Sequence, residues 1–236
     1  MSTLVSYVLD DGVATITIDD GKANVMSVPM LRAIAGALDS AEADEAVVVI
    51  RGRAGMFSGG FDLTVFKRDK HELFAMLKAG AELTERVLSF PYPVVAVCTG
   101  HAIAMGVFLL LSADLRIGTK PDAKMQVNEV AIGLTLPHFA IEVCRQRLSP
   151  AHVTVAAVLA TSYDQQEALA AGFLDEVVQP ELAAELLATR LAHLRTLHMA
   201  SFAATKLRFR GPTLALLRTA IAQDIQTWSQ RFATDA

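Results

Sequence analysis

The chain has 236 residues, of which 53% are apolar and 19% are charged, and it carries a formal net charge of −4. The apolar content is high enough to bury a large core, which excludes an intrinsically disordered chain. The weak negative charge and the lack of a lysine- and arginine-rich run argue against nucleic acid as a partner.

The N-terminal segment predicts two strands and lacks the charged start and apolar core of a signal peptide. The stretch SYVLDDGVATITID has the pattern of a hairpin that turns at Asp11-Gly12. Apolar residues at helical spacing predict a helix over 28–43, and the β-branched run at 46–52 predicts a strand covered on both faces. We therefore expect a cytoplasmic protein that begins with strands and a helix.

The middle of the chain predicts alternating strands and helices. A glycine-rich turn at 53–66 leads into a helix that reaches about Phe90, and 91–119 has the pattern strand, turn, helix and strand. The helix at 105–112 carries no charge, so we expect it to be buried on all sides. No apolar run reaches the ~20 residues that a membrane-spanning helix needs, so we expect no membrane partner.

The C-terminal part is predicted to be mostly helical. After Gly133 helices dominate, with a short strand within 172–178 and an amphipathic helix over 180–234 that breaks at Gly211-Pro212. Since no flexible linker divides the chain, we expect an α/β core with the C-terminal helices packed on it or on another subunit.

Two turns of one type are candidates for holding a ligand. FSGGFD at 57–62 and TGHAIAMG at 99–106 each follow a strand-like run and are expected to open a helix. Helix N-termini present unpaired N–H groups, and glycine lets a ligand approach them. Neither turn matches a dinucleotide fingerprint or a phosphate loop. A pair of donors aimed at one developing oxyanion is the better interpretation.

Most reactive side chains have an ordinary structural interpretation. We expect Cys98 and Cys144 to be buried thiols without a disulfide or a metal, because both lie in apolar runs. His101 is more simply explained by local hydrogen bonding than by catalysis. Asp62 is expected to cap a helix, and Asp114 is expected to order a loop.

Glu129 is the candidate base. Its segment, MQVNEVAIGLTLPH, contains no other formally charged residue if His138 is neutral. The residues alone leave two roles open for it, a surface position after a strand or a carboxylate in a dry pocket. Buried carboxylates are rare and usually functional or paired, which makes the second role the one to test.

The motifs together resemble those of the crotonase (enoyl-CoA hydratase/isomerase) superfamily over residues 5–210. They are MFSGGFDL, GHAIAMG, SADLRIG, NEVAIGLTLP and EALAAGFLDEVV, in this order. The resemblance implies an α/β fold with a spiral of ββα units over 1–180. It also implies a helical region at 181–236 that assembles a homotrimer or a dimer of trimers. The implied substrate is an acyl-CoA thioester, without a metal or a separate cofactor.

The same resemblance assigns roles to individual residues. Two backbone N–H groups hold the thioester oxygen in this superfamily, and the matching donors here are Gly59 and Met105, the latter at a position that is usually glycine. The positions assigned to the acyl pocket are Phe61 and Phe108, and those assigned to coenzyme A are Lys22, Asn24 and Lys206.

One departure from the hydratase pattern points to a particular reaction. Hydratases of the superfamily carry two glutamates, whose positions fall here on Phe108 and Glu129. An arrangement with a single glutamate resembles that of the Δ3,Δ2-enoyl-CoA isomerases, in which one base moves a proton from C2 to C4. The alternatives are a hydratase of low activity that uses Glu129 alone, and a non-catalytic acyl-CoA-binding protein, for which Met105 argues.

Overall fold

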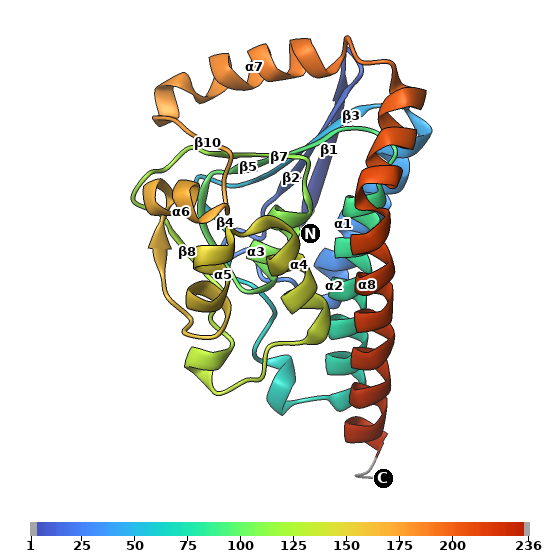
Figure 1. Ribbon diagram of the computed structural model, residues 1–236, viewed down its shortest axis with the longest axis vertical. Coiled ribbons are helices and arrows are strands. Elements are labelled where there is room, and N and C mark those ends of the chain that lie inside the picture. The colour runs from blue at the N-terminus through green and yellow to red at the C-terminus, as the bar shows by residue number, and fades with distance from the viewer. Residues whose placement is uncertain (1–3, 234–236) are drawn as a thin grey trace.

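The computed structural model describes residues 4–233 and shows an α/β fold with a six-stranded sheet at its centre (Figure 1). Its strand order is β1-β2-β3-β5-β7-β10. The strands are β1 Val5–Asp10, β2 Val13–Ile18, β3 Val47–Gly52, β5 Val94–Cys98, β7 Leu115–Gly118 and β10 Glu176–Val177. The predicted hairpin is confirmed, because β1 and β2 pair antiparallel around Asp11 (φ 45°) and Gly12 (φ 74°), as a tight hairpin turn requires.

A second sheet of four short strands lies beside the first, in the order β4-β6-β8-β9. They are β4 Gly55–Ser58, β6 Gly100–Ile103, β8 Lys124–Gln126 and β9 Tyr163–Asp164. Of these, β4, β6 and β8 pair in parallel. Gly100 permits this close pairing, because a Cβ there would lie 1.9 Å from the carbonyl carbon of Gly55. The chain repeats a unit of two strands and a helix three times, as β3-β4-α2, β5-β6-α3 and β7-β8-α4. The predicted crotonase-like ββα architecture is therefore confirmed.

Helices cover both sheets. They are α1 Val28–Ala43, α2 Lys70–Ser89, α3 Met105–Ser112, α4 His138–Arg147, α5 Pro150–Ala157, α6 Gln165–Ala171, α7 Ala183–Leu194 and α8 Met199–Ala233, with short 3-10 turns η1 Val65–Lys67, η2 Val130–Ile132 and η3 Pro180–Leu182. The prediction for α1 is confirmed at both ends, and Ser27 accepts a hydrogen bond from the Met30 N–H to cap it. All eight residues of α3 are buried, as its lack of charge predicted.

The first glycine-rich turn does not open a helix, contrary to the prediction. It passes through β4 and η1 before α2 begins at Lys70. Asp69 caps α2 by accepting hydrogen bonds from the N–H groups of His71 and Glu72. The cap predicted at Asp62 is therefore wrong, and its carboxylate instead accepts from the N–H and hydroxyl of Thr64.

The C-terminal helix α8 is continuous through Pro212, so the break predicted there is wrong. Its buried stripe packs along α2 and α4, which compensates for the hydrogen bond that proline removes (Figure 1). The chain turns between α7 and α8 instead. The predicted boundary at 180/181 falls at η3, and leucines of α7 pack on the valine-rich face of the first sheet. None of the helices within residues 4–233 is long and apolar enough to cross a membrane.

Candidate functional site

Glu129 follows β8 and is buried, with 6% of its surface exposed. Its backbone carbonyl accepts hydrogen bonds from the N–H groups of Ile132 and Leu134, and Gly133 closes this turn with a φ of 81°. The carboxylate oxygen Oε2 has no hydrogen-bond partner within the described residues. Burial without a cation raises the pKa of Glu129 from 4.5 to about 7. A carboxylate in this state is suited to accept and return protons near neutral pH.

Helix α4 lies close to Glu129, and its start is capped by a side chain of α8. The pKa of Cys144 in α4 is raised to about 12, first by burial and then by the charge of Glu129. On α8, Asp224 accepts hydrogen bonds from the N–H groups of His138 and Phe139 and so caps the start of α4. The start of α4 is therefore fixed by this cap.

An aromatic series connects α3, α4 and α8. The rings of Phe108 and Phe139 meet edge to face with centroids 5.7 Å apart, and Phe139 meets Trp228 in the same way at 6.5 Å. Phe108 is fully buried, so the position that the family resemblance assigns to a second carboxylate holds an apolar ring here.

The second turn lies beside the segment that carries Glu129. The Ala104 N–H donates to the Gln126 carbonyl at 2.9 Å, which ties the start of α3 to β8. Ala104 has a positive φ of 48°, a strained state for a residue with a Cβ. The N–H groups of Met105 and Gly106 at the start of α3 donate no hydrogen bond within residues 4–233. They form a ready site for a negatively charged oxygen.

The first turn touches the second but uses its N–H groups differently. The Gly59 N–H donates to the Ala23 carbonyl at 2.7 Å, and the Gly60 N–H donates to the Ser58 hydroxyl at 3.1 Å. The next N–H, that of Phe61, has no acceptor in the part of the chain that the structure describes. This arrangement contradicts the prediction that Gly59 offers a free donor.

Phe61 and Met105 approach each other at helix α2. A Cβ on Gly80 would lie 2.6 Å from Cζ of Phe61 and 3.1 Å from Sδ of Met105, so both side chains rest against the same glycine. Two residues with unpaired N–H groups, one from each turn, therefore lie side by side.

The chain matches the family model for enoyl-CoA hydratase/isomerase over residues 9–236. The chain belongs to the enoyl-CoA hydratase/isomerase family. A probable enoyl-CoA hydratase of Bacillus subtilis is 33% identical over 140 residues, which cover 58% of this chain and about half (54%) of that relative.

Two solved structures of family members are similar over nearly the whole chain. The enoyl-CoA hydratase EchA3 of Mycobacterium ulcerans is 42% identical with a TM-score of 0.90, covering 95% of this chain and 99% of the other. An enoyl-CoA isomerase of Mycobacterium tuberculosis is 39% identical with a TM-score of 0.89, covering 100% of both chains. The names of these relatives thus divide between the two reactions.

Two residues assigned to coenzyme A through the family resemblance are already engaged within the protein. The Asn24 side chain is fully buried, where it donates to backbone carbonyls including that of Ile18 at 2.8 Å and orders the loop before α1. The ammonium of Lys206 lies 2.7 Å from the Asp114 carboxylate and is mostly buried. Lys22, in contrast, is exposed.

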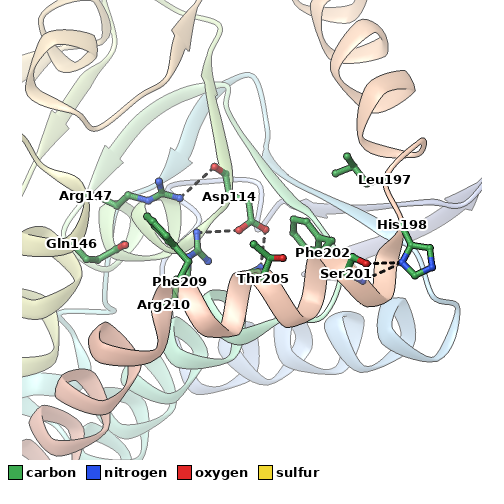
Figure 2. A pocket seen from close by; sticks show the side chains of 11 residues that line it. Asp114, Gln146, Arg147, Leu197, His198, Ser201, Phe202, Thr205, Phe209 and Arg210 are labelled. Carbon is green, nitrogen blue, oxygen red and sulfur yellow. Dashed lines mark hydrogen bonds and ion pairs between the residues drawn. The ribbon is translucent and has the colours of Figure 1, made fainter.

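A cationic cleft of about 470 Å³ lies at the far end of α3 from Met105 (Figure 2). There the Asp114 carboxylate forms ion pairs with Lys206 and, at 3.0 Å, with Arg210. Arg147 donates hydrogen bonds to the carbonyls of Ala113 and Asp114. Arg210 also donates to the Leu88 carbonyl near the end of α2. The predicted loop-ordering role of Asp114 is confirmed by its hydrogen bond from the Val94 N–H, but the sequence did not indicate its two cations.

These cations have structural partners at helix ends. Carbonyls at the C-termini of α2 and α3 carry partial negative charge, which basic side chains offset. The cleft is therefore a junction between helices. Among the described residues no group of three or more His, Cys, Asp or Glu side chains is arranged to hold a metal ion.

Proposed function

We propose that this chain is a Δ3,Δ2-enoyl-CoA isomerase in which Glu129 carries a proton between C2 and C4 of the acyl group. The observation that carries the proposal is the buried carboxylate of Glu129, whose Oε2 has no hydrogen-bond partner within the described residues and whose pKa is raised to about 7. A base whose pKa lies near the working pH can remove a proton from a weakly acidic carbon and then return it.

In this proposal the N–H groups of Met105 and Phe61 hold the thioester oxygen. Removal of the C2 proton places negative charge on this oxygen, and donors fixed before the reaction stabilise that charge most effectively. Both N–H groups are unpaired within the described residues, and their side chains meet at Gly80. Phe61 takes the place predicted for Gly59, whose N–H is bound to Ala23.

The choice of isomerisation over hydration depends on Phe108. Hydration needs a water to be activated and a second proton to be delivered, which two carboxyls share in hydratases of the superfamily. The buried ring of Phe108 supplies neither a proton nor a hydrogen bond, and it keeps water from competing for the dienolate. A hydratase that works with Glu129 alone is the second candidate, because relatives named as hydratases are similar over most of the chain.

A non-catalytic acyl-CoA-binding role receives less support. Met105 would favour the binding role only if its side chain blocked the N–H donors. Its backbone N–H has no acceptor within the described residues, and its sulfur lies against Gly80. A raised pKa at Glu129 also costs stability, which a pure binding protein has no reason to retain.

Assembly into a homotrimer or a dimer of trimers belongs to the same proposal. Helix α8 carries exposed apolar side chains at Leu207, Phe209 and Leu216, with Phe209 85% exposed. Exposed large apolar groups on a surface helix are typical of an interface with another subunit.

The experiment compares turnover of 3-enoyl-CoA with hydration of 2-enoyl-CoA for the wild type, Glu129→Gln and Glu185→Gln. Glu185 is an exposed glutamate on α7 and serves as the matched control. We expect isomerisation to exceed hydration in the wild type and to fall ~10²- to 10⁴-fold in Glu129→Gln, while Glu185→Gln is unchanged. Efficient hydration by the wild type would refute the isomerase, and tight binding of both thioesters without turnover would favour the binding role.

A further inference from the structure

The space between α2 and the two turns is filled by side chains of the residues that carry the proposed donors. Gly80 leaves a notch on α2, in which the Phe61 ring lies with Cζ and Cε1 at 2.6 Å and 2.7 Å from the position of a Cβ. The sulfur of Met105 enters the same notch at 3.1 Å. Both side chains are buried, Phe61 at 8% exposure and Met105 at 0%. No side chain larger than that of glycine would fit at position 80 without displacing them.

The rest of this wall is apolar and also buried. Helix α2 directs Leu73, Met76 and Leu77 inward on the same face as Gly80, and α3 contributes Phe108. Interiors of this kind are close-packed, so an additional chain of methylene groups enters only if resident side chains move.

The thioester oxygen and the acyl chain meet the same two residues in different ways. In the proposed function the oxygen is held by the N–H groups of Phe61 and Met105, and acyl carbons that continued toward α2 would meet the side chains at Gly80. A short acyl group ends before this barrier. A long one has to push the Phe61 ring or the Met105 thioether out of the Gly80 notch.

We propose that Phe61 and Met105, seated on Gly80, form a stop that restricts this protein to short-chain enoyl-CoA thioesters. This inference rests on the proposed function, because it uses the same two donors. Met105 is the more adaptable part of the stop, since a thioether with three rotatable bonds can move where a phenyl ring cannot. Truncating Met105 is therefore the change that opens the pocket.

The test measures kcat/KM for 3-hexenoyl-, 3-octenoyl- and 3-dodecenoyl-CoA in the wild type, Met105→Ala, Gly80→Ala and Gly36→Ala. Gly36 lies in α1, where an added Cβ meets nothing within 4 Å, so this variant controls for glycine replacement in a helix. We expect wild-type kcat/KM to fall at least ~10-fold from hexenoyl to dodecenoyl, since one excess methylene already costs about that factor in a closed pocket.

The two variants are expected to act differently, because only Met105→Ala shifts this preference. Met105→Ala raises dodecenoyl turnover relative to hexenoyl by ~10-fold or more, whereas Gly80→Ala lowers turnover of every chain length because the new Cβ drives both side chains toward the donors. Gly36→Ala behaves as the wild type. Circular dichroism of each variant shows whether it is folded.

A second measurement separates this inference from the proposed function. Calorimetric binding of saturated hexanoyl-CoA and dodecanoyl-CoA needs no turnover, and we expect the wild type to bind hexanoyl-CoA more tightly and Met105→Ala to remove the difference. Equal turnover of all chain lengths, or equal binding of both thioesters by the wild type, would refute the stop and leave the isomerase standing. Loss of turnover at every length together with selective binding would refute the isomerase and leave the stop.

Discussion

Helix α3 separates two carboxylates that are placed in opposite electrostatic environments. Near its start, Glu129 is buried without a hydrogen-bond partner for Oε2 in the described part of the chain, and its pKa rises to about 7. Beyond its end, Asp114 receives Lys206 at 2.7 Å and Arg210 at 3.0 Å (Figure 2). Both carboxylates are largely removed from water, yet only one of them has its charge compensated.

The difference separates the part of the molecule that holds the fold from the part proposed to perform the reaction. A compensated carboxylate stays ionised and joins helix ends, and removal of it leaves two cations buried without an anion. An uncompensated carboxylate destabilises the fold when it ionises, and this is also what makes it a stronger base. The following changes test this contrast, in order of decreasing expected effect.

Asp114→Asn should destabilise the protein most. Lys206 and Arg210 would remain buried without a counter-charge, a loss worth about 3–5 kcal/mol for a buried ion pair that loses one partner. Unfolding in urea at neutral pH measures it. Asp122→Asn, which breaks the exposed pair with Lys120, is the control and should change little. A similar small loss in both variants would mean that the cationic junction does not stabilise the fold.

Glu129→Gln should stabilise the protein by an amount that grows as the pH rises from 4.5 to about 7 and stays constant above that. The folded-state pKa of about 7 lies above the ordinary 4.5, so the folded chain binds the proton more tightly and loses stability as the pH rises through this range. Glutamine imitates the protonated form, so we expect a gain of about 3 kcal/mol at about pH 8, since each pKa unit is worth about 1.4 kcal/mol.

Thermal unfolding of both proteins across pH measures this gain. The two curves should converge at about pH 4, where Glu129 is protonated in the folded and unfolded states alike. A constant difference between the curves at every pH would show that the carboxylate is not strained by burial.

The elements that the sequence predicted well are those with strong local signals. The Asp11-Gly12 turn fixes its hairpin through two left-handed residues, and the apolar period of 28–43 is long enough to define α1 at both ends. The uncharged stretch at 105–112 was expected to be a helix buried on all sides, and it is. Of the two roles that the residues left open for Glu129, the structure favours the buried one, and a lone acid in an apolar segment was the signal for it.

The features that were missed depend on contacts between distant segments. Strands β4, β6 and β8 are too short for an alternating pattern to show. Pro212 predicted a helix end, but the packing of α8 on α2 and α4 overrides it. The engagement of the Gly59 N–H by Ala23, and of Lys206 by Asp114, joins residues that no sequence pattern pairs.

The pH dependence of turnover should report the uncompensated carboxylate directly. With Glu129 as the sole acid and base, kcat/KM for isomerisation should rise about 10-fold for each pH unit below its pKa of about 7 and level off above it. A reaction that used a second carboxyl as an acid would instead give a bell-shaped profile. Initial rates in buffers of constant ionic strength distinguish the two shapes, and a bell would favour the hydratase.

The smallest expected effect concerns coenzyme A and separates two lysines that the family resemblance had grouped. Lys22 is exposed beside the first turn, so Lys22→Ala should raise KM for the thioester by roughly two- to fivefold, as loss of a surface charge contact does. Lys206 is held by Asp114 and cannot reach a phosphate without breaking that pair, so Lys206→Ala should lower stability and leave KM unchanged. High salt should weaken binding by the wild type but affect Lys22→Ala less, because exposed charges are screened. A rise in KM for Lys206→Ala alone would mean that the ion pair with Asp114 opens when the substrate binds. The charge of Asp114 would then be compensated by Lys206 only in the substrate-free protein, and the contrast with Glu129 would hold only in that state.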